Sequence, residues 1–212
     1  WYGSSTGLGA SGTPSNADHV LDSGGGADSY GSSVGTAGDV DGDGYADVIV
    51  GAMDYGNGQY QEGAAAVYRG SSVGLDEDPL WVQEGSSIAA HLGKSAGTAG
   101  DVNGDGYSDV IVGAWMYTDD QDDEGAAAVY CGYASGLMAI PLWAGQSDQV
   151  NAHFGYSVGT AGDVNGDGYA DVVVGATWYD GGLTHEGRAY VFHGSATGLS
   201  ATAARMLEIS VA

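Results

Sequence analysis

The stretch DVDGDGYAD at Asp39–Asp47 decides the fold, because the chain repeats it as DVNGDGYSD at Asp101–Asp109 and as DVNGDGYAD at Asp163–Asp171. Each copy begins 62 residues after the one before it. A fixed period of this length is typical of repeat architectures, in which every period forms one supersecondary unit that stacks on its neighbours. The 212-residue chain is therefore expected to hold three such units.

Oxygen-bearing side chains occupy every second position of the loop, and glycines between them allow a sharp turn. Calcium takes roughly six to eight oxygen ligands in a flexible geometry, which a tight loop of this kind provides. Without a cation, the clustered carboxylates would repel one another. The loops thus predict three calcium sites, with a backbone carbonyl at the seventh position, and the expected ligands are Asp39, Asp41, Asp43, Tyr45 and Asp47; Asp101, Asn103, Asp105, Tyr107 and Asp109; and Asp163, Asn165, Asp167, Tyr169 and Asp171.

The first loop has Asp41 where the other two have Asn103 and Asn165. An amide oxygen ligates calcium with less charge, so the first site is predicted to bind most tightly. The pattern differs from an EF-hand, because its last acidic residue stands at the ninth position and not at the twelfth. Magnesium is the weaker candidate, since it demands near-ideal octahedral geometry. An acidic turn without a metal is the alternative, and three copies in fixed register disfavour it.

Short β-rich runs separated by glycine-rich turns flank each loop, and the 40 glycines and four basic residues leave no helical pattern. In the first period, strands are predicted up to the loop, at 47–52, near 64–69 and near 80–83. The run Val48–Ala52 is apolar on both faces and must be covered on both sides. Blades of a β-propeller provide that cover. A parallel β-helix is the alternative, but its coils are much shorter than this period.

The predicted fold is therefore all-β, with propeller blades of about 62 residues and four antiparallel strands each, at 29–90, 91–152 and 153–212. The opening WYGSSTGL at Trp1–Leu8 matches the segment after a third strand, so 1–28 is expected to end a preceding blade, with an orphan edge strand near His19–Asp22. Three blades cannot close a ring of about four to eight. We expect the remainder of a longer chain, or self-association, to close it.

The unit Phe154-Gly155 followed by Gly175-Ala176, with the loop between them, resembles the FG-GAP repeat of the integrin α-subunit propeller and of related bacterial and fungal proteins. The resemblance implies that the cation loop joins the first and second strands on one face of the propeller. It also implies that ligands bind on the opposite face, at the loops joining strands two to three and four to one. The departures are Tyr30 and Leu92 in place of the Phe, and Met53, Trp115 and Thr177 in place of the Pro.

The formal net charge of −24 comes from 28 acidic and four basic residues. Such a surface repels nucleic acid and anionic membranes, and no apolar run approaches the roughly 20 residues of a membrane span. Calcium modules with several loops suit the calcium-rich extracellular medium, which predicts a secreted or cell-surface protein. The single Cys131 excludes an intrachain disulfide, and its alignment with Arg69 and His193 predicts a surface strand position.

The loops between the second and third strands vary between copies and are rich in aromatic and acidic residues. Variable loops on a regular scaffold are where recognition usually lies, so Trp115, Tyr117, Trp178 and Tyr179 are the candidate ligand-binding residues. Packing is the alternative for the tyrosines, because they recur in register with Tyr55, and it is also an alternative for Trp115 and Trp178. Other residues that recur in register are expected to have structural roles, as a repeated hydrogen bond or in packing: Glu62, Glu124, Glu186, His91 and His153.

The chain has no nucleophile elbow, no zinc-binding histidine set and no phosphate-binding glycine loop, so we expect no enzymatic activity. Three functions remain open. The leading one is a calcium-stabilised module for extracellular recognition or adhesion, with a protein partner. The others are a lectin of the same fold, whose aromatic loops hold a glycan, and an architectural domain of a larger protein.

Overall fold

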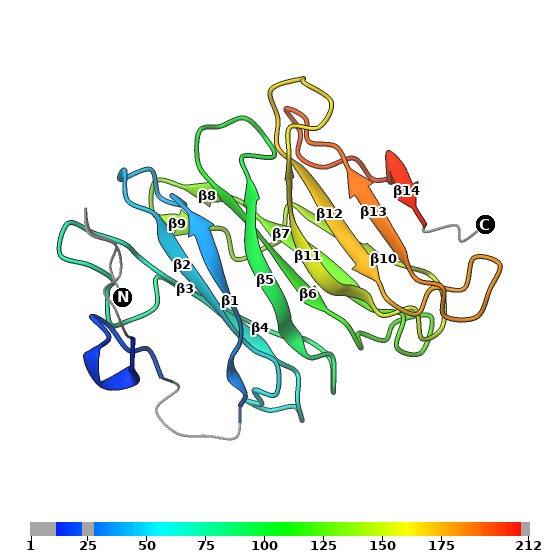
Figure 1. The fold of residues 1–212 in the computed structure, drawn as a ribbon, viewed down its shortest axis with the longest axis horizontal. Coiled ribbons are helices and arrows are strands. Elements are labelled where there is room, and N and C mark those ends of the chain that lie inside the picture. The colour runs from blue at the N-terminus through cyan, green and yellow to red at the C-terminus, as the bar shows by residue number, and fades with distance from the viewer. Residues whose placement is uncertain (1–11, 23–27, 209–212) are drawn as a thin grey trace.

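Residues 12–22 and 28–208 are described by the structure, a computed structural model. This part of the chain contains three four-stranded antiparallel sheets that lie side by side in the order of the chain (Figure 1). One 3-10 turn, η1 (Pro14–Asn16), precedes them. No helix among the described residues is long and apolar enough to cross a membrane.

Each period of the sequence forms one sheet. The first contains β1 (Tyr30–Gly38), β2 (Asp47–Ala52), β3 (Ala64–Tyr68) and β4 (Trp81–Glu84). The second contains β5 (Leu92–Gly100), β6 (Asp109–Ala114), β7 (Ala126–Tyr130) and β10 (Trp143–Gln146), and the third contains β11 (Phe154–Gly162), β12 (Asp171–Ala176), β13 (Arg188–Phe192) and β14 (Arg205–Leu207).

The predicted strands are confirmed, because each lies where the sequence placed it and pairs antiparallel with the next strand along the chain. One feature was not predicted. The second unit carries an additional short hairpin, formed by β8 (Gly132–Tyr133) and β9 (Gly136–Leu137).

The burial of the second strand in each sheet depends on how many neighbouring sheets pack against it. In β6, which belongs to the middle sheet, every residue is buried. In β2 and β12, which belong to the outer sheets, the positions that are only half-buried include Val48 and Val173. The apolar run VIVGA therefore needs cover on both faces, as predicted, and the middle sheet receives it from its two neighbours.

Neighbouring sheets approach one another closely through glycine. The innermost strands β1, β5 and β11 lie next to each other. Gly93 has a φ of +84°, and a Cβ added to it would collide with the Ala64 carbonyl oxygen of the first sheet. Parallel bridges join Gly63 to Leu92 and Gly125 to Phe154. The FG pair thus begins the innermost strand and also contacts the preceding sheet.

Two sequence predictions for the chain ends have different outcomes. The orphan edge strand near His19–Asp22 is wrong, since these residues form no strand. Leu21 packs instead against the outer face of the first sheet, beside Val50 and Tyr68, while Val20 is exposed. This segment lacks the alternating pattern that a half-buried strand needs. The segment Trp1–Leu8, expected to end a preceding blade, lies outside the described residues.

Candidate metal centre

Each acidic loop winds its backbone around its first aspartate. In the first loop, which joins β1 to β2, the Asp39 carboxylate accepts hydrogen bonds from the backbone N–H groups of Gly42 (2.7 Å), Asp43 (3.0 Å) and Gly44 (2.9 Å). Gly42 and Gly44 have φ values of +74° and +91°, a region that favours glycine. The Asp101 and Asp163 carboxylates accept the same three bonds.

Three carboxylates converge in the first loop. Asp39, Asp41 and Asp43 each place one oxygen within 4.8 Å of the others. In the second and third loops, the Asn103 and Asn165 amides donate to Asp105 (2.9 Å) and Asp167 (2.8 Å). All potential ligand atoms in the first cluster are oxygens, which is the donor set that calcium prefers.

The ninth position of the loop is buried and holds the fold together. Asp47 is 1% exposed, and its two carboxylate oxygens accept the backbone N–H groups of Val40 (2.9 Å) and Gly70 (2.8 Å). Asp109 and Asp171 make the equivalent bonds. These aspartates therefore tie the loop to the segment that follows the third strand, and Asp47 lies outside the cluster formed by Asp39, Asp41 and Asp43.

Burial also affects the charge of this aspartate. It raises the pKa of Asp109 to about 6, and it raises the pKa of Asp47 as well. The backbone N–H donors and, for Asp109, the Cys131 thiol act in the opposite direction, but burial is the larger cause. A carboxylate oxygen accepts two hydrogen bonds, so lone pairs remain for a cation. A nearby cation would favour the ionised form.

The residue that follows the third strand contacts the third position of the loop. In the first copy, Arg69 Nε lies 2.6 Å from Asp41 Oδ2, and the Asp41 side chain is 3% exposed. In the second copy, Asn103 Nδ2 donates to Cys131 Sγ at 3.6 Å. No local pattern in the sequence indicates this contact, because 28 residues separate its members.

The predicted surface position of Cys131 is wrong. Its side chain is 1% exposed, because the residue lies beneath the second loop at the end of β7. Burial, together with the charge of Asp109, raises the pKa of its thiol to about 12. Cys131 is thus a packing residue with an unreactive thiol.

The three loops contact one another in series. The Asp39 carbonyl accepts the Ser108 N–H at 2.9 Å, and the Asp101 carbonyl accepts the Ala170 N–H at 2.9 Å. The Tyr107 ring lies against Gly42, where an added Cβ would be 2.8 Å from a ring atom. A change in the conformation of one loop would therefore alter its contacts with the next loop.

A chain of rings lies on the loops at the opposite end of the sheets. Ring centroids are 4.8 Å apart between Trp115 and His153, 4.4 Å between His153 and Trp178, and 5.1 Å between Trp178 and His185. His153 is 3% exposed, which confirms its predicted packing role, whereas Trp178 is 47% exposed. The candidate Trp115 lies inside this chain, with its indole N–H buried and without a hydrogen-bond partner.

The two candidate tyrosines lie deeper, at the edges of the sheet junctions. Tyr117 packs against the core between the first two sheets, and Tyr179 packs against the core between the second and third. Arg188 covers the Tyr179 ring at 3.9 Å from its centroid. The predicted structural bond of the recurring glutamates is confirmed for Glu62 and Glu124, which accept the Asn57 and Asp119 N–H groups at 2.6 and 3.1 Å.

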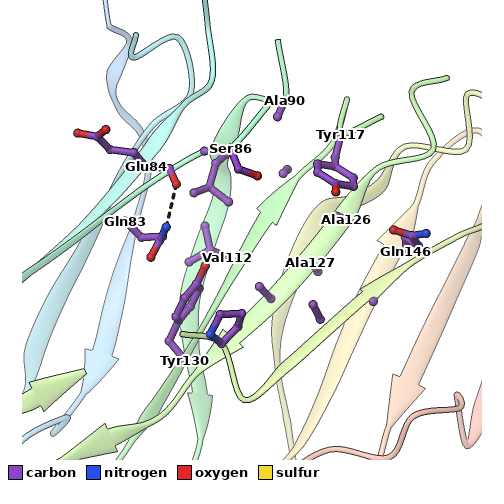
Figure 2. Close-up of a pocket in the computed structure, with 17 residues that line it drawn as sticks. Gln83, Glu84, Ser86, Ala90, Val112, Tyr117, Ala126, Ala127, Tyr130 and Gln146 are labelled. Carbon is purple, nitrogen blue, oxygen red and sulfur yellow. Dashed lines mark hydrogen bonds between the residues drawn. The ribbon is translucent and has the colours of Figure 1, made fainter. Parts of the chain in front are cut away.

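A cavity of about 370 Å³ opens between the first and second sheets. Tyr117 and Tyr130 contribute rings to its lining, and Gln83 and Gln146 contribute polar groups (Figure 2). Besides Tyr130, β7 contributes only the small residues Ala126, Ala127 and Ala128 to the lining. The cavity is a consequence of this alanine run. The sequence shows the run, but it does not show that the run lies between two sheets.

Comparison with known proteins agrees with this geometry. The model of the FG-GAP repeat family matches residues 30–68, 95–130 and 154–192. Each match begins within an innermost strand, includes one acidic loop and ends within or next to the third strand of its sheet.

Integrin α subunits are similar to this chain over most of its length. Integrin alpha-PS2 of Drosophila melanogaster is 38% identical over 170 residues, which is 76% of this chain and 11% of that protein. Integrin alpha-V of Gallus gallus is 33% identical over 174 residues, covering 76% of this chain and 16% of the relative. Integrin alpha pat-2 of Caenorhabditis briggsae is 31% identical over 189 residues, covering 82% and 14%. The chain thus spans only a small part of these relatives.

Proposed function

The chain belongs to the FG-GAP repeat family, and on this premise we propose that it is a calcium-binding β-propeller module for extracellular recognition or adhesion, in which calcium is structural. The observation that carries the proposal is the convergence of Asp39, Asp41 and Asp43 in a loop whose backbone is already folded around a carboxylate. Integrin-like FG-GAP repeats form a non-enzymatic family, as the sequence predicted.

Three calcium ions are proposed, one for each loop. In the first loop, Asp39, Asp41, Asp43 and the Tyr45 carbonyl would hold the ion, with the free lone pairs of Asp47. The second and third loops offer the same positions, with an asparagine at the third. When bound, calcium supplies positive charge among carboxylates that otherwise repel one another.

Calcium would stabilise the fold at two levels. Within a loop, it would offset the cost of keeping the buried ninth aspartate ionised, since burial raises the pKa of Asp47 and Asp109. Between loops, the hydrogen bonds from Ser108 to Asp39 and from Ala170 to Asp101 link one candidate site to the next. We therefore expect the ions to stiffen the whole row of loops.

The test is a pair of thermal melts, one in EDTA and one in millimolar CaCl₂. A ligand present at 100 times its dissociation constant stabilises the folded state by about 2.7 kcal/mol per site. We expect a large rise of the melting midpoint in calcium and a smaller rise for the variant Asp43→Ala. An equal midpoint in both buffers, with no calcium heat in calorimetry, would reject the proposal.

The partner surface is proposed on the ring chain at the opposite end from the loops, with Trp115, Tyr117, Trp178 and Tyr179 as its candidate residues. Trp178 supports this choice, because nearly half of its large side chain faces solvent. Trp178→Ala should weaken partner binding at least tenfold. Val73→Ala is the matched control, since Val73 is exposed and lies in the loop between β3 and β4.

A lectin is the second candidate, because exposed aromatic rings also stack on sugars. Binding to a glycan array that is lost in Trp178→Ala would favour the lectin over a protein-binding module. A silent array, together with capture of a protein partner, would favour adhesion. Neither kind of binding would leave the architectural role.

Ring closure is also part of the proposal. The outer faces of the first and third sheets carry partly exposed apolar residues, such as Val48 and Val173. We propose that further blades, from the remainder of a longer chain or from other copies, cover these faces. Solution mass by light scattering distinguishes a single chain from an assembly of several copies.

A further inference from the structure

Two positions of the repeat vary between the copies. The first is the third position of the acidic loop, and the second is the residue that follows the third strand. The first copy pairs Asp41 with Arg69, the second pairs Asn103 with Cys131, and the third has Asn165 and His193 at these places. The one acidic residue at the loop position, Asp41, thus coincides with the one arginine at the second position.

The first two pairs have the same placement and opposite polarity. Asp41 directs Oδ2 to the Arg69 guanidinium at 2.6 Å, so the loop residue carries the negative charge of an ion pair. Asn103 directs Nδ2 to Cys131 Sγ at 3.6 Å, so the loop residue is the donor. In both copies the remaining polar atom of the side chain, Oδ1 of Asp41 or of Asn103, accepts the N–H group two residues later.

The charge of the three loops is equal once Arg69 is included. The first loop has four carboxylates, and Arg69 adds one positive charge, which leaves a net charge of −3. The second and third loops have three carboxylates each and also carry −3. Arg69 therefore cancels the one charge by which the first loop differs from the others.

From these observations we propose that Arg69 is a built-in cation that sets the calcium affinity of the first loop. This inference rests on the proposed calcium function. Arg69 occupies Oδ2 of Asp41 and leaves Oδ1, so that Asp41 offers a cation one oxygen, as an asparagine does. Arg69 also repels a second cation at the same place. The first site then binds calcium about as tightly as the others, and not most tightly.

The ion pair of Asp41 and Arg69 is partly shielded from solvent. The Asp41 side chain is 3% exposed and the Arg69 side chain 36%, so the contact is shielded on the aspartate side and partly open to solvent on the arginine side. Solvent screening reduces the effect of the arginine charge. We expect a change in affinity of about tenfold when this charge is removed.

The experiment isolates the first loop by silencing the other two with Asp105→Ala and Asp167→Ala. In this background, calorimetric calcium titration compares Arg69→Met, which removes the charge and keeps an unbranched stem, with Arg69→Lys, which keeps the charge. We expect Arg69→Met to bind calcium about tenfold more tightly and Arg69→Lys to remain within threefold of the background. Arg205→Met is the matched control, because Arg205 is an exposed arginine in β14, and it should change nothing.

The loop partner completes a double-mutant cycle. Asp41→Asn alone leaves the Arg69 charge uncompensated beside the loop, so we expect at least tenfold weaker calcium binding. Asp41→Asn combined with Arg69→Met recreates the charge of the second loop and should return the affinity to within about threefold of the background. A double variant that still binds calcium at least tenfold more weakly than the background would overturn the charge balance between Asp41 and Arg69.

The outcomes separate this inference from the function on which it rests. No calcium binding in the unaltered chain would overturn both. Normal calcium binding, with an unchanged affinity in Arg69→Met, would overturn only the role of Arg69 and would leave a structural ion pair. Native mass spectrometry of Arg69→Met in the otherwise unaltered chain gives a second measurement should the silenced background not fold. At limiting calcium, the proposal predicts a larger singly loaded fraction than in the parent chain.

Discussion

The two junctions between neighbouring sheets share one backbone arrangement and differ in their side chains. Both have a parallel bridge to the innermost strand of the next sheet. At the junction of the first and second sheets, Ala126 and Ala128 of β7 line a cavity of about 370 Å³. At the junction of the second and third, the equivalent residues of β13 are Arg188 and Tyr190, and the Tyr190 ring lies 5.3 Å from that of Phe154.

This difference distinguishes the residues that set the distance between the sheets from the residues that fill the space between them. Glycines fix how closely the backbones approach, and they recur in every copy. The third strand decides how well the outer part of the junction is packed, and there the copies differ. Stability should therefore depend strongly on the glycines, and more weakly on the filling residues.

The largest loss of stability is expected from a substitution that separates the backbones at the junction of the first and second sheets. Gly93→Ala adds a Cβ that collides with the Ala64 carbonyl oxygen at a φ of +84°, and should lower the free energy of unfolding by about 4 kcal/mol in urea titrations. Gly31→Ala is the control, since Gly31 has the same φ and nothing within 4 Å of the added Cβ. It should cost only about 1 kcal/mol from backbone strain. Equal losses in both variants would contradict the role of close approach.

The next largest loss of stability is expected from a substitution that removes a ring from the junction of the second and third sheets. Tyr190→Ala removes a ring that is 8% exposed and packs against Phe154 and Phe192, and should cost about 3 kcal/mol in the same urea titration. Tyr60→Ala is the control, because the Tyr60 side chain is 71% exposed, and it should change stability by less than about 0.5 kcal/mol. A loss for Tyr190→Ala no larger than the control would show that the ring does not fill this junction.

The smallest change in stability is expected from a substitution that adds a ring to the cavity between the first and second sheets. Ala128→Tyr copies Tyr190 into the cavity and should raise the free energy of unfolding by about 1 kcal/mol. Ala99→Tyr is the control, because Ala99 is 0% exposed in the core between the second and third sheets, where added volume should destabilise. A loss of stability in Ala128→Tyr similar to that in Ala99→Tyr would mean that the cavity cannot accept a ring.

Much of the fold could be predicted from the sequence, because its determinants are local and repeated. The loop residues, the apolar run after them and the turn glycines lie within about 15 residues of each other, so spacing alone placed β1 and β2. The fourth strand, predicted near Leu80–Gln83, lies one residue further along, at Trp81–Glu84. The edge strand near His19–Asp22 was wrong, since few neighbouring residues specify it.

The rest depends on contacts between segments that lie far apart in the sequence. The bond from Gly70 N–H to Asp47 spans 23 residues and the ion pair of Arg69 with Asp41 spans 28, and no local pattern indicates either one. Burial of Cys131 depends on the loop above it, and the cavity depends on the neighbouring sheet. Alignment of the copies indicated which positions correspond, but not what each contacts.

If all three acidic loops bind calcium, the number of bound ions per chain should be three. Native mass spectrometry of the intact chain in calcium should show three bound ions, and two for Asp43→Ala, which removes one carboxylate of the first cluster. Three ions lost to EDTA and restored by calcium, and two in the variant, would support one calcium site in each loop. A count of zero or one in the unaltered chain would contradict it.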